Sequence, residues 1–171
     1  MECMLALDPG LTTGYCFATH RDRRLYLIPG QYKFSLWELD SLLLSLPNQP
    51  WTHIIYEDFQ YRNRARAGLD LTPVKMIGII EYRECMPNSR IGFHKQSAAE
   101  GKGFYTDAKL KELGVYVKGL KHGNDATRHL LHWINFKAGS RIIDPKETIM
   151  ELDLQKWTLE SDFRDFDIKL P

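Results

Sequence analysis

Three carboxylate side chains occupy positions from which they could act on one substrate. Asp8 follows a short apolar segment, Glu57 ends another, and Asp125 lies at the start of a predicted helix. Ligands of α/β proteins bind at the carboxyl ends of strands, where neighbouring parallel strands bring their ends together. If the two apolar segments form such strands, Asp8 and Glu57 lie side by side.

The chemistry expected of these carboxylates is the binding of a divalent cation. Ionised carboxylates that lie this close repel one another, and a divalent cation removes that cost. Oxygen ligands without a cysteine cluster favour Mg²⁺ or Mn²⁺ over zinc. We therefore expect Asp8, Glu57 and Asp125 to converge within about 8 Å, because paired catalytic metals lie roughly 3.5–4 Å apart.

Two histidines extend this set. His129 and His132 lie four and seven residues after Asp125, so all three share one face of a helix. A carboxylate and an imidazole on one face can bind a metal or activate a water molecule. Arg128 lies about 60° around the helix from that line and is a candidate phosphate contact. Alternatively, either histidine packs in the core, and the helix dipole alone favours an acid such as Asp125 in the first turn.

Charge is distributed unevenly along the 171 residues. The net charge is only +1, but residues 61–121 carry 12 Lys+Arg against 6 Asp+Glu, and residues 144–171 carry 4 against 8. A basic middle and an acidic tail suggest a face for a polyanion, although a mixed solvated surface is an equal alternative. In the segment 60–68, arginines at every second position follow aromatic residues, which suits phosphate contacts and base stacking unless the segment is a solvated loop. The candidate DNA contacts here are Phe59, Tyr61, Arg62, Arg64 and Arg66.

Composition is typical of a globular protein, with 43% hydrophobic and 26% charged residues. No segment has the apolar length of a membrane span, and the N-terminus lacks the features of a signal peptide, so we expect a cytoplasmic protein. The three scattered cysteines suit neither a disulfide framework nor a zinc site, and reduced thiols are expected.

The elements that must position these residues alternate between strands and helices. Three strands close in sequence suggest an antiparallel meander, and a fourth strand reached through a helix favours a parallel neighbour. The predicted fold is therefore α/β, with a mixed sheet flanked by helices. The predicted strands cover 4–7, 15–19, 25–34 (interrupted near 29–30), 53–57 and 90–94. The predicted helices cover 35–46, 73–86, 106–113, 124–136 with Asn124 as N-cap, and 145–155, whereas 59–71 and 96–105 are expected to be loops.

Three motifs resemble those of the RuvC-type Holliday junction resolvases. Leu5 to Tyr15 (LALDPGLTTGY) is similar to the first motif, an apolar strand followed by Asp-Pro-Gly. Ile54 to Phe59 (IIYEDF) resembles the second, a strand that ends in Glu, and Asn124-Asp125-Ala126 resembles the third. The resemblance covers residues 4–136 and implies a ribonuclease-H-like nuclease domain over 1–138, followed by an acidic extension over 139–171 that is partly helical or disordered.

The resemblance also implies an activity. It implies a homodimer that cuts four-way DNA junctions with two Mg²⁺ or Mn²⁺ ions per active site, one activating the attacking water and the other stabilising the leaving 3′-oxygen. Asp8 would bridge both metals, Glu57 would bind one, and Asp125 would bind the other. Bacterial relatives carry a further Asp where this chain has Arg128, so His129 would replace it, as in a phage-type relative acting in the bacterial or infected-host cytoplasm. His132 remains an alternative fourth ligand.

The same resemblance extends to DNA contacts and assembly. It implies that Phe59 or Tyr61 inserts near the crossover, and it adds Lys95, Lys102 and Lys109 as phosphate contacts. The helix over 73–86, with Met76, Ile79, Ile80 and Tyr82, is the expected dimer face unless it packs on its own sheet. The alternatives are another ribonuclease-H-like nuclease acting on hybrids, flaps or branched DNA, and a junction-binding protein with little activity. The first motif also resembles the first phosphate-binding loop of actin-like ATPases, but this chain is too short for the two domains of that fold.

Overall fold

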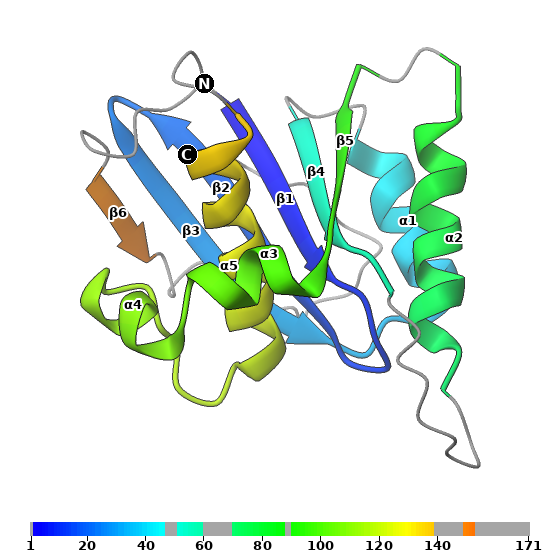
Figure 1. Ribbon diagram of the computed structural model, residues 1–171. Coiled ribbons are helices and arrows are strands. Elements are labelled where there is room, and N and C mark those ends of the chain that lie inside the picture. The colour runs from blue at the N-terminus through cyan, green and yellow to red at the C-terminus, as the bar shows by residue number, and fades with distance from the viewer. Residues whose placement is uncertain (1, 47–50, 60–69, 88–89, 139–148, 153–171) are drawn as a thin grey trace.

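The computed structural model describes residues 2–46, 51–59, 70–87, 90–138 and 149–152. A mixed sheet runs through the middle of the molecule in the order β5-β4-β1-β2-β3-β6 (Figure 1). Strands β1, β2 and β3 form the predicted antiparallel meander, while β4 pairs parallel with β1, β5 with β4, and β6 with β3. The bounds are β1 (Glu2–Asp8), β2 (Thr13–Arg21), β3 (Arg24–Tyr32), β4 (Trp51–Glu57), β5 (Gly92–Gln96) and β6 (Ile149–Leu152). The predicted α/β fold with a mixed sheet is confirmed.

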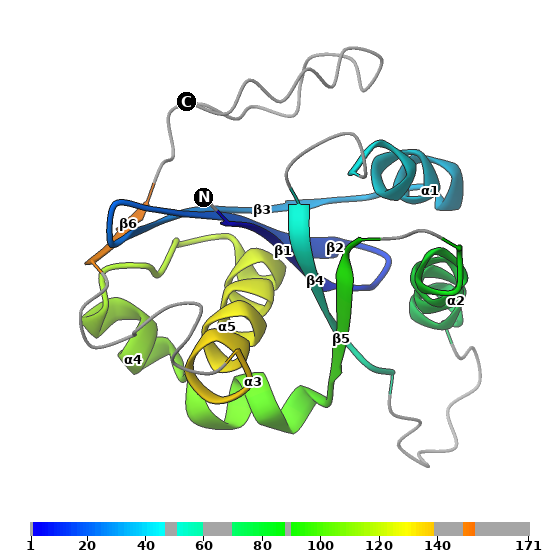
Figure 2. The same ribbon diagram turned by 90° about the horizontal axis from the view of Figure 1, so that it is seen from above.

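Helices cover both faces of this sheet. Figure 2 shows α1 and α2 on one face and α3, α4 and α5 on the other. The bounds are α1 (Leu36–Ser45), α2 (Thr72–Glu84), α3 (Ala98–Phe104), α4 (Asp107–Glu112) and α5 (Lys121–Phe136). Ser35 caps α1 and Thr106 caps α4, each by accepting a hydrogen bond from a backbone N–H of the first turn. The sheet is therefore buried from both sides.

Strand β1 lies at the centre of two hydrophobic cores. Its residues alternate between them: Cys3, Leu5 and Leu7 face the core under α1 and α2, while Met4 and Ala6 face the core under α4 and α5. This period of two follows from the pleat of a strand that is buried on both faces. All five of these side chains are fully buried. The strand is thus fixed firmly, and the position of its carboxyl end is fixed with it.

Four local predictions were wrong. Residues 98–104 form helix α3 instead of a loop, because Ser97 and Glu100 make a capping box that outweighs the two glycines inside the helix. Helix α5 begins after Leu120, and Asn124 lies inside it, where its side chain bonds both the N–H and the carbonyl of Val117.

The other two corrections concern strands. Strand β3 continues through Pro29 and Gly30, which pair with Cys16 and Tyr15. Residues 149–152 form β6 instead of part of a helix, since they pair with the edge of β3. The remainder of the acidic extension lies outside the described residues, so the boundary predicted at 138 stays a prediction.

Helix α2 packs mainly against its own sheet. Met76 and Ile80 are fully buried in the first core and Ile79 packs against it, whereas Tyr82 is 57% exposed. Of the predicted dimer face, only the Tyr82 side is therefore accessible to a partner. The three cysteines are free thiols, as expected. Among the described residues, no helix combines the length and the apolar character that crossing a membrane requires.

Candidate metal centre

The parallel pairing of β1 with β4 brings Asp8 and Glu57 to the same edge of the sheet. Leu7 pairs with Tyr56, and the two acids are the next residues of their strands. Helix α5 crosses close to this end of the sheet: a Cβ atom at Gly14 would lie only 1.9 Å from the backbone oxygen of His122. Glycine at position 14 thus permits the approach that places the first turns of α5, with Asp125, beside the strand ends.

Lys102 of α3 is the common partner of the three predicted acids. Its Nζ atom lies 3.5 Å from Asp8 Oδ1, 2.8 Å from Glu57 Oε2 and 3.2 Å from Asp125 Oδ2. Oxygens that all lie within 3.5 Å of one nitrogen are at most about 7 Å apart, so the carboxylates converge within the distance expected from the sequence. The sequence motifs predicted this convergence, but they identified Lys102 only as a phosphate contact.

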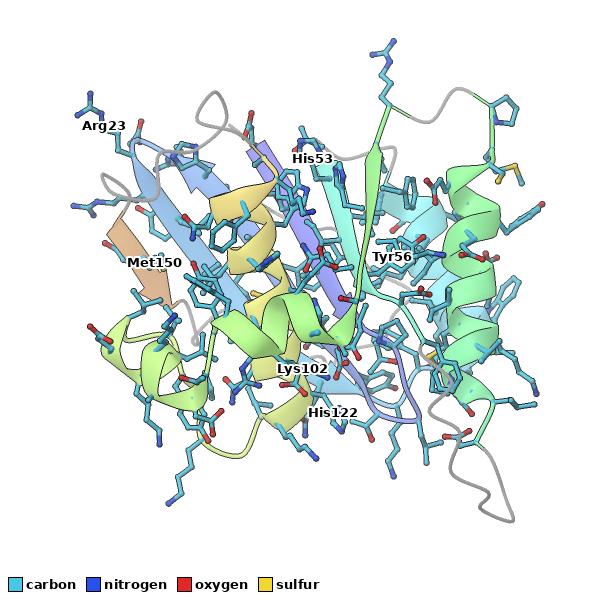
Figure 3. The ribbon with its side chains drawn as sticks, in the orientation of Figure 1. Arg23, His53, Tyr56, Lys102, His122 and Met150 are labelled. Atoms are coloured by element: carbon cyan, nitrogen blue, oxygen red, sulfur yellow. The ribbon has the colours of Figure 1, made fainter. Side chains whose placement is uncertain are left out.

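His122 is a site residue that the sequence reasoning missed. Its Nδ1 lies 3.0 Å from Asp8 Oδ2, and one ligand atom each from Asp8, His122 and Asp125 fall within 4.8 Å of one another. Figure 3 shows His122 and Lys102 at the same end of the sheet. The signal was present, because His122 precedes Asp125 by three residues and therefore shares its face of the helix. The expected start of α5 at Asn124 left His122 outside the helix.

The two predicted histidines have different surroundings. His129 is fully buried, with Nε2 lying 2.8 Å from Glu57 Oε2 and Nδ1 lying 2.9 Å from Gln96 Oε1. His132 packs its ring 4.9 Å from that of Phe136 and does not belong to the group of converging ligand atoms. Of the two histidines predicted as the fourth metal ligand, only His129 contacts one of the three acids, and that acid is Glu57.

Burial and charge set the pKa values of the two strand-end acids in opposite directions. Burial, only partly offset by Lys102, raises the pKa of Asp8 to about 6. Burial also acts to raise the pKa of Glu57, but hydrogen bonds from His129 and Lys102 outweigh it and lower the pKa to about 2. Burial opposes the charge of Lys102, and its carboxylate neighbours nevertheless raise its pKa. At neutral pH the site is thus a buried group of anions with one ammonium among them.

The chemistry of these side chains fits a hard divalent cation. Asp8 and Asp125 offer carboxylate oxygens and His122 offers an imidazole nitrogen, a ligand set suited to Mn²⁺ and, through its oxygens, to Mg²⁺. Both acids are largely buried, at 7% exposure each. The ammonium of Lys102 offsets part of their negative charge, as buried carboxylates require a cationic partner.

Several predicted DNA contacts have partners inside the protein. Arg128 donates to the Tyr105 carbonyl at 2.7 Å and pairs with Asp125 and Asp107. Lys95 pairs with Glu81 and with Asp58, and Lys109 lies 3.6 Å over the ring of Phe104. Tyr61, Arg62, Arg64 and Arg66 lie outside the described residues. These positions therefore remain predictions as contacts for DNA.

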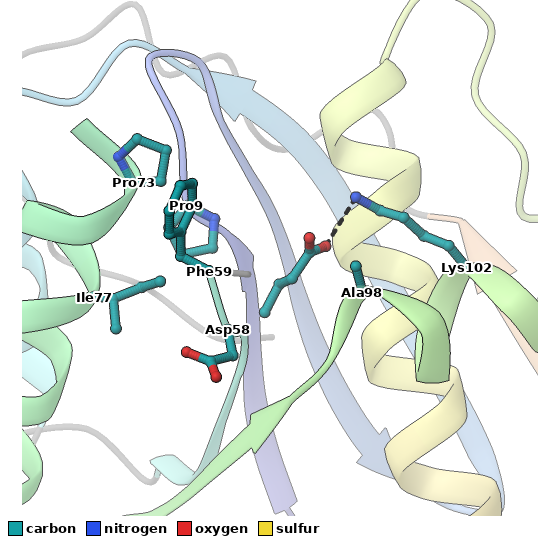
Figure 4. Close-up of a pocket in the computed structure, with 8 residues that line it drawn as sticks. Pro9, Asp58, Phe59, Pro73, Ile77, Ala98 and Lys102 are labelled. Atoms are coloured by element: carbon teal, nitrogen blue, oxygen red, sulfur yellow. Dashed lines mark ion pairs between the residues drawn. The ribbon is translucent and has the colours of Figure 1, made fainter. Parts of the chain in front are cut away.

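A cavity of about 410 Å³ opens beside the carboxylates (Figure 4). Its apolar wall consists of side chains that follow β1 and β4 and of side chains from α2 and the start of α3. Its polar wall contains Glu57, Asp58 and Lys102. Phe59, a predicted stacking residue, lies in the apolar wall. The apolar lining residues are Pro9, Phe59, Pro73, Ile77 and Ala98. The cavity can accept a group with one apolar face and one charged edge.

Comparisons with known proteins agree with this architecture. The sequence matches no protein-family model, and no curated protein sequence matches it significantly. A structure of Thermus thermophilus RuvC superposes with a TM-score of 0.54 at 15% identity, covering 77% of this chain and 93% of that one. A structure of T. thermophilus RuvC in complex with a Holliday junction substrate gives a TM-score of 0.59 at 11% identity, covering 78% and 93%. The chain thus has a RuvC-type, ribonuclease-H-like fold, as the sequence motifs predicted.

Proposed function

We propose that this protein is a metal-dependent endonuclease that resolves four-way DNA junctions. The observation that carries the proposal is the convergence of Asp8, Glu57, His122 and Asp125 at the carboxyl ends of β1 and β4 on a RuvC-type fold. The similar T. thermophilus RuvC was solved with a Holliday junction substrate, which makes branched DNA the first substrate class to test.

Asp8, His122 and Asp125 would hold one Mg²⁺ or Mn²⁺, and Asp8 with Glu57 would hold a second. Bound there, two such ions supply a water nucleophile and stabilise the leaving 3′-oxygen of a phosphodiester. The protein's own contribution is to hold these acids in fixed positions in a buried setting. Lys102, whose raised pKa keeps it charged, lies among the acids. Once metal ions take its place there, its ammonium would donate to an oxygen of the scissile phosphate.

The cavity next to Glu57 is the natural place for the nucleotide beside the scissile phosphate. The apolar wall formed by Pro9, Phe59 and Ile77 can receive a base that has lost its stacking partner at a branch point. Arg62, Arg64 and Arg66 follow Phe59 of this wall closely in the sequence, and they would contact the flanking phosphates. This arrangement favours a branched substrate over a continuous duplex.

A homodimer would provide the two active sites that two symmetric nicks require. Trp37 of α1 and Tyr82 of α2 are 76% and 57% exposed, and the two helices lie side by side on one face of the sheet. Light scattering coupled to size exclusion should give twice the monomer mass for the wild type. Trp37→Glu and Tyr82→Glu should shift the mass toward that of the monomer, and a wild type that stays monomeric at micromolar concentration would contradict this assembly.

The decisive test is cleavage of a synthetic four-way junction with Mg²⁺, Mn²⁺ or EDTA. Linear duplex, flap and RNA–DNA hybrid serve as control substrates, and Asp8→Asn serves as the control protein. We expect paired nicks in the junction that need metal and disappear in Asp8→Asn. Preferential cutting of a control substrate would replace the junction with another substrate of a ribonuclease-H-like nuclease. Tight binding without cutting would make the protein a junction binder instead.

A further inference from the structure

His129 has no free nitrogen with which to bind a metal. Its ring is fully buried, and both nitrogens are engaged, one with Glu57 at 2.8 Å and the other with Gln96 at 2.9 Å. His122, in contrast, is partly exposed and belongs to the group of converging ligand atoms. The two histidines of α5 that reach the acids therefore occupy different places: His122 faces the proposed metals, and His129 lies behind Glu57.

Helix α3 holds the ring of His129 in place. A Cβ atom at Gly101 would lie 2.7 Å from His129 Nδ1, so only glycine lets α3 pack this tightly against the imidazole. The next residue of α3 is Lys102, whose ammonium lies 2.8 Å from the same Glu57 oxygen that His129 contacts. His129 thus supports Glu57 directly and supports the helix that carries Lys102.

Gln96 determines which nitrogen of His129 carries the proton, and therefore whether Nε2 can donate it to Glu57. Among the described residues, the buried amide nitrogen of Gln96 has no hydrogen-bond partner. Exchanging the amide oxygen and nitrogen, which have nearly the same shape, places this nitrogen against Nδ1. Nδ1 then accepts a hydrogen bond, and an uncharged imidazole carries its proton on Nε2, where it donates to Glu57. This orientation satisfies the buried donor without adding a second buried charge.

We propose that His129 is a positioning residue that fixes Glu57 for metal binding, with Gln96 fixing the imidazole in turn. The inference rests on the proposed metal centre and replaces the sequence-based expectation that His129 is itself a ligand. Partners of this kind commonly contribute a factor of roughly 10 to 100 in metal affinity, because they orient the ligand that they contact. The effect of His129 must therefore pass through Glu57.

The test measures binding of Mn²⁺ alone, without DNA, by titration calorimetry and electron paramagnetic resonance. His129→Leu removes the donor to Glu57 at similar volume, and His129→Gln keeps an amide donor at that distance. His132→Leu is the matched control, because His132 lies on the same helix outside the site. Each variant's melting temperature without metal shows whether it folds, and if His129→Leu does not, Gln96→Leu takes its place.

We expect His129→Leu to weaken Mn²⁺ binding roughly 10- to 100-fold at unchanged stoichiometry, with most of the loss recovered in His129→Gln and no loss at all in His132→Leu. In a Glu57→Gln background, His129→Leu should have no further effect. The nitrogen coupling of bound Mn²⁺, seen by electron spin echo, should persist in His129→Gln and vanish in His122→Ala.

Three results would overturn the inference: an unchanged affinity in His129→Leu, an equal loss in the Glu57→Gln background, or a nitrogen coupling that vanishes in His129→Gln. The outcome is separable from the proposed function. A protein that shows the expected pattern with Mn²⁺ but does not cut junctions would retain the positioning role of His129 and lose the resolvase assignment.

Discussion

At the scale of single residues, Asp8 is the acid whose protonation controls the proposed metal centre. Its pKa is raised to about 6 by burial, so a proton competes with metal below that pH. A protonated carboxyl does not bind a cation, and the sign of the effect follows directly: metal binding must strengthen as pH rises toward 6 and then level off. Glu57, with its pKa lowered to about 2, stays ionised throughout this range.

We therefore expect the apparent affinity for Mn²⁺ to rise by up to about tenfold per unit between pH 5 and 6, and to change little above pH 7 from this source. Titration calorimetry in several buffers would measure both the affinity and the protons released on binding. Asp8→Asn, which lacks this titrating group, should release fewer protons on binding than the wild type. A flat affinity between pH 5 and 7 would mean that Asp8 is not a ligand.

His122 is the second residue whose role can be isolated. We expect His122→Ala to lower Mn²⁺ affinity at least tenfold, because losing a ligand costs no less than losing a residue that merely orients one. His132→Ala, on the same helix, serves as the control and should bind Mn²⁺ as the wild type does. Equal binding by both variants would remove His122 from the site and leave Asp8, Glu57 and Asp125 as its only ligands among the residues described.

At the scale of elements, the close crossing of α5 over the sheet depends on small residues. A Cβ atom at Gly123 of α5 would lie 2.7 Å from the carbonyl oxygen of Gly30 in β3, and one at Gly30 would lie 2.2 Å from the ring of Tyr15. Backbone atoms cannot move aside as a side chain can. Gly123, whose missing Cβ lets α5 lie against the backbone of Gly30, and Gly14, which lies against the backbone of His122, therefore set the distance between helix and sheet, and with it the position of Asp125.

Gly123→Ala should destabilise the fold even though alanine is the better helix former. The overpacking cost is about 1–3 kcal/mol, against a gain of about 1 kcal/mol in helix propensity. Gly78→Ala in α2 is the matched control, because a Cβ atom added at Gly78 would have nothing within 4 Å. It should stabilise the protein by up to about 1 kcal/mol. Urea unfolding at equilibrium distinguishes the two, and stabilisation of both variants would show that α5 can shift at little cost.

At the scale of the whole molecule, two histidines join the edge of the sheet to α5. His53 Nδ1 of β4 lies 3.0 Å from His94 Nε2 of β5, and both imidazole rings pack tilted against Trp133, with centroids 4.6 and 4.7 Å from its ring. Burial, and then the neighbouring His94, lowers the pKa of His53 to about 4, and burial lowers the pKa of His94. Because the unfolded chain binds protons more readily at these positions, the pair stabilises the fold above about pH 6.5 and loses that contribution as pH falls toward 4.

The free energy of unfolding should accordingly decline from pH 6.5 to 4. Each histidine contributes less than the limit of about 1.4 kcal/mol per pH unit, because both rings are partly exposed to solvent. Chemical denaturation across this range measures the slope. In His53→Gln the slope should be shallower than in the wild type, whereas His20→Gln, outside this cluster, should leave it unchanged. An identical slope in all three proteins would show that other groups control acid unfolding.

The sequence by itself determined strands β1 to β5, most of the helices and the three acids. The short apolar runs of β1 and β4, the turn residues after Asp8 and the caps at Ser35 and Thr106 are local signals, readable without neighbours. A short glycine-containing segment gives a weaker signal, so the prediction of a loop at α3 was wrong. The prediction of a helix at β6 was wrong because pairing with β3 outweighs local preference there.

Only the tertiary structure decided which further side chains join the three acids in the site. Lys102 lies 94 residues from Asp8 in sequence and Gln96 lies 33 residues from His129, so no periodicity connects them. Their contacts exist because α3 and α5 pack closely at glycine positions on one face of the sheet. Close packing of this kind depends on the complementary shapes of elements that are far apart in sequence, so it forms only in the folded core. That packing also separated His122 from His129, two histidines on one helix to which local spacing alone assigns equal roles.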